Sequence, residues 1–196
     1  MRLGDLAEVR SGLVLARKVS RTPTEYTYPL LNLRSVKDAG SIDTETLDAF
    51  FAADALHAEY LSQVGDIIVR LSAPYTAVLI EEETAGMVIS SNFAMIRTDP
   101  QQLLPSYLYW LLNTPMVKKG IYENTTSNML AAIKPMYFSN FDISPLPLEK
   151  QRIIGELNLL RCRESRLLRQ LAEERNRYAA ALIDKAQKEM RRGMNA

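Results

Sequence analysis

The chain has 196 residues, of which 47% are hydrophobic, and its formal net charge is +1. This length predicts one domain with an appendage or two small domains, and the apolar content is too high for a disordered chain. No apolar run approaches the roughly 18–20 residues that span a bilayer, and the segment Met1–Asp5 lacks the apolar stretch of a signal peptide. We therefore expect a cytoplasmic protein that is not in a membrane, and the single Cys162 agrees with a reducing compartment.

The charge is distributed unevenly along the chain. Residues 147–196 hold 12 Lys and Arg against 7 Asp and Glu, a balance of +5, whereas residues 1–146 hold 12 against 16, a balance of −4. A net-acidic globular part is not typical of a general nucleic-acid binder. Any DNA-binding hypothesis must therefore place its cations locally.

The first half of the chain predicts short strands joined by turns. Residues 3–9 predict a helical turn or the start of a strand, and Gly12 in the following loop is free to take positive φ. The polar segment 16–28, broken by Pro23, predicts an exposed loop. The spacing of aromatic and leucine residues in 49–61 predicts a helix. Strands are expected at 28–34, 67–71, 77–80, 87–90 and 92–97, with turns at 38–41, 63–66 and 81–86.

Helices are expected after the last strand. Pro105 suits the first turn of a helix over 103–113, whose buried face would be Leu108, Leu111 and Leu112. A second short helix is expected at 116–122, followed by an exposed polar stretch at 123–128 and an extended segment at 142–147. Together these elements predict an α+β domain over residues 1–146, with a curled, mainly antiparallel or mixed sheet and short helices.

Residues 147–196 predict one long helix that forms a coiled coil. Apolar residues recur there at helical spacing for about eleven turns, interrupted only by Gly155. At ~1.5 Å per residue, roughly 42 residues span about 63 Å, so much of this helix must pack on something other than its own globular domain, and another long helix is the best candidate. The expected dimerisation seam consists of Ile153, Leu157, Leu160, Leu167, Leu171, Tyr178 and Leu182.

The sequence lacks a recognisable catalytic group. The single histidine, His57, cannot by itself anchor a metal site or a Ser-His-Asp arrangement. The eight glycines are scattered and form neither a phosphate loop nor a dinucleotide fingerprint. The acidic run Glu81–Glu83 fits a solvated turn. We therefore expect a binding or scaffolding protein with no enzyme activity, no metal and no cofactor.

The remaining chemistry suits DNA recognition by loops. Arg can read guanine and Asn can read adenine, while Ser, Thr and Lys suit phosphates, although such residues are also ordinary loop surface. The candidates are Arg10, Ser11, Lys18, Arg21, Asn32, Arg34, Arg70, Ser72, Tyr75, Thr76, Asn92, Lys118, Lys119, Asn124, Thr125, Thr126, Ser127, Asn128 and Lys134.

Several short motifs resemble, in their order and spacing, the specificity subunits of type I restriction–modification systems. They are Leu3–Leu6 with Arg10–Gly12, the Gly-Asp-apolar strand Gly65–Arg70, the strand and helix Ser91–Arg97 and Pro105–Leu112, and the junction Ile143–Ile154. The junction, with its Pro-Leu-Glu-x-Gln-x-x-Ile pattern, is the most specific of them. The resemblance covers nearly the whole chain.

This resemblance implies a non-catalytic DNA recognition subunit. Family members usually carry two recognition domains and two helical regions in a chain about twice this length, so this chain resembles half of a subunit. It is then expected to form a homodimer through antiparallel helices and to read double-stranded DNA at a bipartite palindromic site. The implied partners are methylation subunits, which bind S-adenosylmethionine and catalyse the reaction, and a restriction subunit. Two alternatives stay open: a protein-interaction module dimerised through the helix, which the acidic globular part favours, and an enzyme with an unrecognised site.

Overall fold

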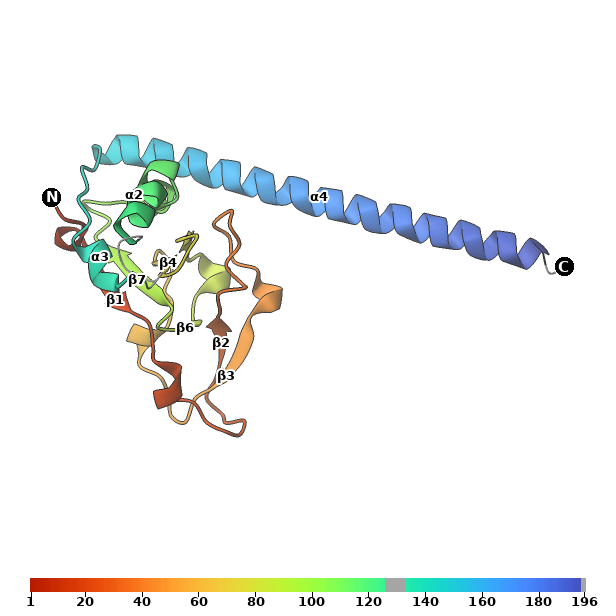
Figure 1. Ribbon diagram of the computed structural model, residues 1–196, viewed down its shortest axis with the longest axis horizontal. Coiled ribbons are helices and arrows are strands. Elements are labelled where there is room, and N and C mark those ends of the chain that lie inside the picture. The colour runs from red at the N-terminus through yellow and green to blue at the C-terminus, as the bar shows by residue number, and fades with distance from the viewer. Residues whose placement is uncertain (126–132, 195–196) are drawn as a thin grey trace. The chain divides into compact units, whose positions relative to one another are not determined.

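The computed structural model describes residues 1–125 and 133–194 of the chain (Figure 1). The fold divides into two compact units, Met1–Glu156 and Leu157–Ala196. The first unit contains every strand that the structure describes, and it includes the first two turns of the long helix α4 (Leu148–Met194). The predicted α+β fold with a long C-terminal helix is confirmed, and the helix continues through Gly155 without interruption.

The larger sheet has the strand order β1-β7-β4-β5, and every neighbouring pair in it is antiparallel. Its strands are β1 (Ala7–Ser11), β4 (Ile67–Arg70), β5 (Ala77–Leu79) and β7 (Phe93–Thr98). Three consecutive residues of β4, from Ile67 to Val69, are fully buried, because both faces of this strand are covered. The unbroken apolar run in the sequence is typical of such a strand.

The smaller sheet has the strand order β3-β2-β6 and is mixed. In it β2 (Thr27–Leu31) is antiparallel to β3 (Asp48–Phe51) and parallel to β6 (Val88–Ile89). One core cluster joins the two sheets, since Leu31 and Ile89 of the smaller sheet lie together with Ile68 and Met95 of the larger one. The two sheets therefore share this cluster, while a second cluster contains Phe50 of β3 and Val88 of β6.

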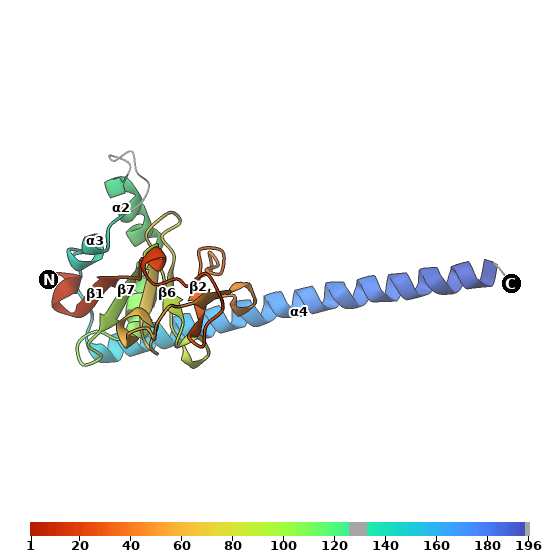
Figure 2. The ribbon, with the colours of Figure 1, turned by 90° about the horizontal axis from the view of Figure 1, so that it is seen from below.

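Three short helices accompany the sheets: α1 (Pro105–Leu112), α2 (Pro115–Thr125) and α3 (Pro135–Ser139). Helix α1 packs on β4 and β5, and α3 packs on β1 and β7 (Figures 1 and 2). Pro105 and Pro135 occupy first-turn positions, where the missing N–H costs nothing. The strand and turn predictions are confirmed within one to three residues, as are the helices after residue 103.

Two expectations for the first half are wrong. Residues 49–61 form strand β3 and a short 3-10 turn, Ala58–Tyr60, because Phe50 pairs with Tyr28 of β2 and this pairing overrides the helical spacing. Gly12 does not take positive φ. A Cβ at this position would lie 2.2 Å from the Ser90 carbonyl oxygen, so glycine is needed for close backbone approach.

The buried face of α1 also differs from the prediction. Leu108 and Leu112 are buried as expected, but Leu111 is only partly buried. Tyr107 and Tyr109 are buried in addition. The prediction counted only leucines as buried residues. Tyrosine can also be buried, because its ring is apolar and its hydroxyl can form a hydrogen bond inside the protein.

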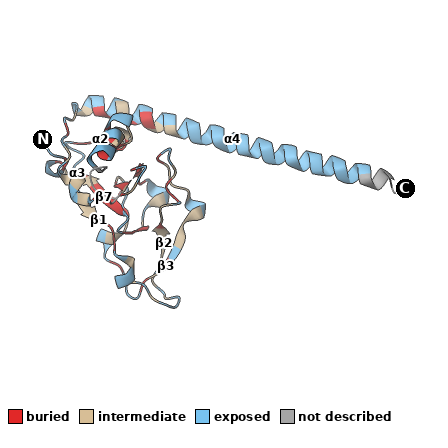
Figure 3. Ribbon diagram, in the orientation of Figure 1, coloured by how far each residue is buried: buried red, intermediate tan, exposed pale blue. Residues whose placement is uncertain are grey.

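The second unit is a single helical segment. Every side chain from Arg163 to Met190 is exposed in the chain by itself (Figure 3). The seven expected seam residues, which begin at Ile153 in the first unit, are between 49% and 68% exposed. Along the described residues, no helix is both long and apolar enough to cross a membrane.

Candidate nucleic-acid interface

Backbone hydrogen bonds gather several loops at one end of the larger sheet. In an antiparallel sheet, β4 ends where β5 and β7 begin. The Leu71 N–H donates to the Asn92 carbonyl at 3.0 Å, and the Arg70 N–H donates to the Thr76 carbonyl at 3.0 Å. The Ile133 N–H donates to the Leu71 carbonyl at 2.8 Å, which brings in the segment that leads to α3. Loops far apart in the sequence therefore meet beside the end of β4.

The end of β1 joins this group, since the Gly12 N–H donates to the Phe93 carbonyl at 3.2 Å. Five of the predicted DNA-binding residues belong to these segments, and we call them the β4 end. They are Ser11, Arg70, Ser72, Asn92 and Lys134. Ser11, Asn92 and Lys134 are exposed, whereas Arg70 and Ser72 are partly buried.

Two other predicted residues lie at the same place but are buried. Tyr75 is 3% exposed and Thr76 is 0% exposed. Tyr75 has positive φ, 54°, and its N–H closes a turn by donating to the Ser72 carbonyl. Among the described residues, neither the Arg70 Nε nor the Thr76 Oγ1 has a hydrogen-bond partner, although both atoms are buried. Native proteins leave few such atoms unpaired.

Lys118 of α2 is within electrostatic range of Asp38, which lies in the loop that follows β2. Burial lowers the pKa of Lys118, and the nearby Asp38 carboxylate partly offsets that effect. The same loop reaches α1, because the Tyr109 hydroxyl donates to the Gly40 carbonyl at 2.9 Å. Sequence reasoning placed Asp38 in a turn and Tyr109 in the motif Pro105–Leu112, but it selected neither residue for the site.

Four of the eight predicted cations are already close to a carboxylate. The pairs are Arg10 with Glu8 and Glu59, Lys18 with Asp54, Arg34 with Asp48, and Lys119 with Glu123. Four predicted cations have no carboxylate of the described residues within 4.0 Å: Arg21, Arg70, Lys118 and Lys134. Two of these four belong to the β4 end, and Lys118 lies on α2.

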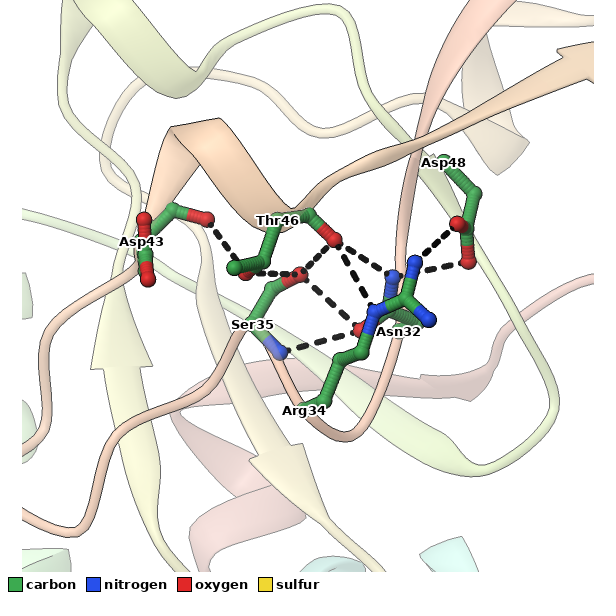
Figure 4. A network of polar contacts seen from close by, with 6 residues as sticks. All are labelled: Asn32, Arg34, Ser35, Asp43, Thr46 and Asp48. Atoms are coloured by element: carbon green, nitrogen blue, oxygen red, sulfur yellow. Dashed lines mark hydrogen bonds and ion pairs between the residues drawn. The ribbon is translucent and has the colours of Figure 1, made fainter.

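Asn32 and Arg34 hold their own loop together (Figure 4). The Thr46 carbonyl accepts from Asn32 Nδ2 at 2.9 Å, from Ser35 Oγ at 3.0 Å and from Arg34 Nε at 3.3 Å. Asn32 Oδ1 accepts from the Ser35 N–H, and Asn32 Nδ2 also donates to Asp48. Both ends of the Asn32 amide are therefore engaged within the loop.

The structure does not bring the remaining predicted residues to the β4 end. Lys18 and Arg21 lie on either side of Ser20, whose N–H donates to the carbonyl of Phe51, the last residue of β3. Phe51 pairs with Thr27, the first residue of β2, so both cations lie near that end of the smaller sheet. Asn124 Nδ2 donates to the Gly120 carbonyl on α2 at 2.7 Å. Thr126, Ser127 and Asn128 lie outside the described residues, as does the side chain of Thr125.

The residues of the Gly-Asp motif hold the fold. Asp66 is 2% exposed and accepts two hydrogen bonds from Arg97 of β7, at 2.7 and 2.8 Å. Asp66 also accepts from the Gln63 N–H at 2.8 Å. The Asp66 hydrogen bond raises the pKa of Arg97 above its ordinary value. A bidentate pair between a buried carboxylate and a partly exposed arginine fixes the turn before β4 against β7.

The junction motif anchors the start of α4. Gln151 is 1% exposed, and its Oε1 accepts from the Leu104 N–H at 2.8 Å. One turn later, a Cβ on Gly155 would lie 2.3 Å from the Ser106 Oγ, so the helix can approach α1 only with glycine there. Sequence reasoning selected Gln151 as part of the motif and noted Gly155 only as an interruption of the helix, and it predicted the structural role of neither residue.

The structure offers no arrangement for metal chemistry within its described residues, where no three His, Cys, Asp or Glu side chains come together. His57 precedes the 3-10 turn Ala58–Tyr60 and lies outside any helix.

Two solved structures are similar to this chain. One, from work on complex assembly and conformational transition of the type I R-M system, is 20% identical with a TM-score of 0.65. The other, the HsdS subunit from Thermoanaerobacter tengcongensis, is 21% identical with a TM-score of 0.58. Each match covers 89% of this chain and 45% of the other chain, so this chain spans less than half the length of the chains it matches.

The resemblance to type I specificity subunits is thus confirmed at the level of the fold. No protein-family model matches the sequence, and a search of the curated proteins finds no similar sequence.

Proposed function

We propose that this chain is a DNA recognition subunit of a type I restriction–modification system and that it catalyses no reaction itself. The observation that carries the proposal is the shared fold with an HsdS subunit over 89% of the chain. The cations at the β4 end that have no carboxylate partner support it, because they are free to meet DNA without breaking an ion pair.

The β4 end is the proposed DNA contact. Arg70 and Asn92 carry groups that suit base edges, while Ser11, Ser72 and Lys134 suit phosphates. Predicted cations with a carboxylate partner would have to exchange that partner for DNA. Among the buried candidates, Tyr75 contributes by shaping the turn rather than by direct contact in this conformation.

The helix supports dimerisation through a seam that faces away from its anchor. Gln151 and Gly155 are both buried in the first unit, and Ile153 lies about 200° around the helix from each of them. Ile153 is accordingly 58% exposed. The seam residues from Ile153 to Leu182 would bury their apolar surface against a second helix, each contributing roughly 1.5–3 kcal/mol.

In the proposed assembly two copies pair through antiparallel helices with twofold symmetry. Each globular unit would then read one half of a bipartite palindromic site. Methylation subunits would supply S-adenosylmethionine and catalysis, a restriction subunit would be a further partner, and this chain would need no cofactor. The assembly would act in the cytoplasm.

Selection from a random-sequence DNA pool tests the proposal. The chain is incubated with the pool, with and without the methylation subunit, and the bound DNA is sequenced. We expect enrichment of one bipartite motif. If neither condition enriches a motif, the chain is not a sequence-specific recognition subunit.

Sedimentation tests the dimer separately. Replacing Leu160, Leu167 and Leu171 by Gln should convert the dimer to a monomer, because each substitution removes apolar burial from the seam. The matched control replaces Arg166 and Arg177, on the other side of the helix, by Gln and should leave the dimer intact. A leucine variant that sediments as an unchanged dimer would show that the seam is wrong.

A protein-interaction module remains the second candidate, because residues 1–146 carry a balance of −4 and half of the predicted cations are already paired. The two candidates differ in the salt dependence of binding. Phosphate contacts release counterions, so the logarithm of a DNA affinity falls linearly with the logarithm of salt concentration. Sequence-independent, weak binding to DNA at every salt concentration would favour the protein-interaction module.

A further inference from the structure

We infer that Arg70 is a base-reading residue of the β4 end, with Thr76 beside it, whereas Lys134 contacts the DNA backbone. The inference rests on the proposed DNA-recognition function and assigns separate roles within the same surface. Three features of Arg70 carry it: its place opposite Thr76, its buried Nε and its lack of an ion pair with the described residues.

Arg70 and Thr76 are neighbours across the β4–β5 pair. The Arg70 N–H donates to the Thr76 carbonyl at 3.0 Å, and Val69 is in register with Ala77. Residues directly opposite each other in an antiparallel pair project from the same face. The unpaired Nε of Arg70 and the unpaired Oγ1 of Thr76 therefore belong to side chains on the same face of the sheet, and both atoms are buried. Because native proteins leave few buried polar atoms unpaired, we take this pair as the place that DNA completes.

The side chain of Arg70 is held by the sheet. Its backbone is in register with Phe93, which is 0% exposed, and its Nε is buried while the residue as a whole stays partly exposed. The exposed part of Arg70 therefore extends from a side chain whose Nε is already buried in the fold. A planar fork in a fixed orientation matches the O6 and N7 acceptors of guanine and is less suited to an averaged contact with phosphate.

Lys134 has the opposite character. Its side chain is exposed, no described carboxylate lies within 4.0 Å of it, and it directly precedes α3 without a capping hydrogen bond from its side chain. A flexible, hydrated ammonium makes a point-charge contact that suits a phosphate of any sequence. The two cations should therefore produce different defects when they are replaced.

The test measures binding of the full chain, with the methylation subunit, to the enriched DNA and to each single-base-pair variant of it, over a range of salt concentrations. Arg70→Lys keeps the charge and removes the fork, so it should lose about tenfold or more of the discrimination at one base pair while the salt dependence stays as in the wild type. Lys134→Gln should weaken binding to every sequence alike and reduce the salt slope by about 1. Arg21→Gln, at the far end of the smaller sheet, is the matched control and should change neither quantity.

Thr76→Val supplies a second variant that tests the same place without altering charge. Because it replaces an unpaired buried hydroxyl by a methyl group, the variant should melt at the wild-type temperature or higher and should weaken discrimination at the same base pair as Arg70→Lys. The inference is overturned if Arg70→Lys discriminates as well as the wild type, or if it weakens all sequences equally with a smaller salt slope. If the wild type itself enriches no motif, the proposed DNA-recognition function fails. If the wild type enriches a motif but the variants behave as just described, only the role assigned to Arg70 fails.

Discussion

Replacing Gln151 should destabilise the first unit, although the Gln151 side chain hydrogen-bonds to neither sheet. Gln151 lies in the first turn of α4 and is 1% exposed. Its Oε1 accepts from the Leu104 N–H at 2.8 Å, and its Nε2 donates to the carbonyls of Leu146 at 2.7 Å and Gln102 at 3.1 Å. One side chain thus connects the start of α4 to the segment before α1 and to its own lead-in.

Gln151→Met keeps the length of the side chain and removes all three hydrogen bonds. At a net contribution of about 1 kcal/mol for each bond, the free energy of unfolding should fall by about 3 kcal/mol. The loss would be larger if water cannot reach the three backbone groups left without a partner. Because domains are stable by only roughly 5–15 kcal/mol, a change of this size is easily measured.

Urea unfolding followed by the fluorescence of the single Trp110 on α1 is a suitable assay, because this residue reports on the first unit. Arg152→Met is the matched control, since Arg152 is the exposed next residue of the same helix, and it should change stability by less than about 0.5 kcal/mol. If Gln151→Met unfolds within about 1 kcal/mol of the wild type, the junction motif does not stabilise the fold through these bonds.

Three further substitutions probe the fold. Gly12→Ala should lower the stability of the fold in a thermal melt by about 3 kcal/mol or more, because its Cβ would lie 2.2 Å from the Ser90 carbonyl oxygen. Gly120→Ala on α2, whose Cβ would have nothing within 4 Å, should raise the stability by about 0.5–1 kcal/mol. The reverse order of the two melting temperatures would contradict this reasoning. The Gln102 side chain, which donates to Asp99, lowers the pKa of that carboxyl. The stability that this contact contributes is present above about pH 4, which is the pKa of Asp in the unfolded chain, and is lost as the pH falls through the lowered pKa of the folded state. Asp99→Asn should therefore make the unfolding free energy less dependent on pH below about pH 4. An unchanged acid-unfolding profile would show that the contact contributes nothing.

The parts of the fold that the sequence predicted are those set by local pattern. Strand β4 follows from an unbroken apolar run, and α4 follows from helical spacing held over many turns. The failure at Phe50 has a physical cause, since its partner Tyr28 lies 22 positions earlier and nothing local indicates that pairing. Helix α3 was not predicted, because its five residues are too few for a periodic signal.

The candidate site was predictable in residue type but not in partners. Arg34 and Arg70 look equivalent in the sequence, as arginines at the ends of apolar strands. In the structure Arg34 is tied to Asp48 and to the Thr46 carbonyl, whereas Arg70 has no carboxylate near it. That difference depends on which acidic residue the chain folds back to each arginine, and spacing along the sequence does not determine it.

The paired cations of the globular unit have a consequence for how such a protein would search a genome. Arg10, Lys18, Arg34 and Lys119 already neutralise carboxylates, so they offer little to random DNA. Random sequence outnumbers a target by many orders of magnitude, and weak attraction to it keeps more of the protein free to find the target. A recognition unit with this charge arrangement would slide less along DNA and would leave wrong sites sooner. It would depend on its partner subunits to hold the DNA once the right site is bound.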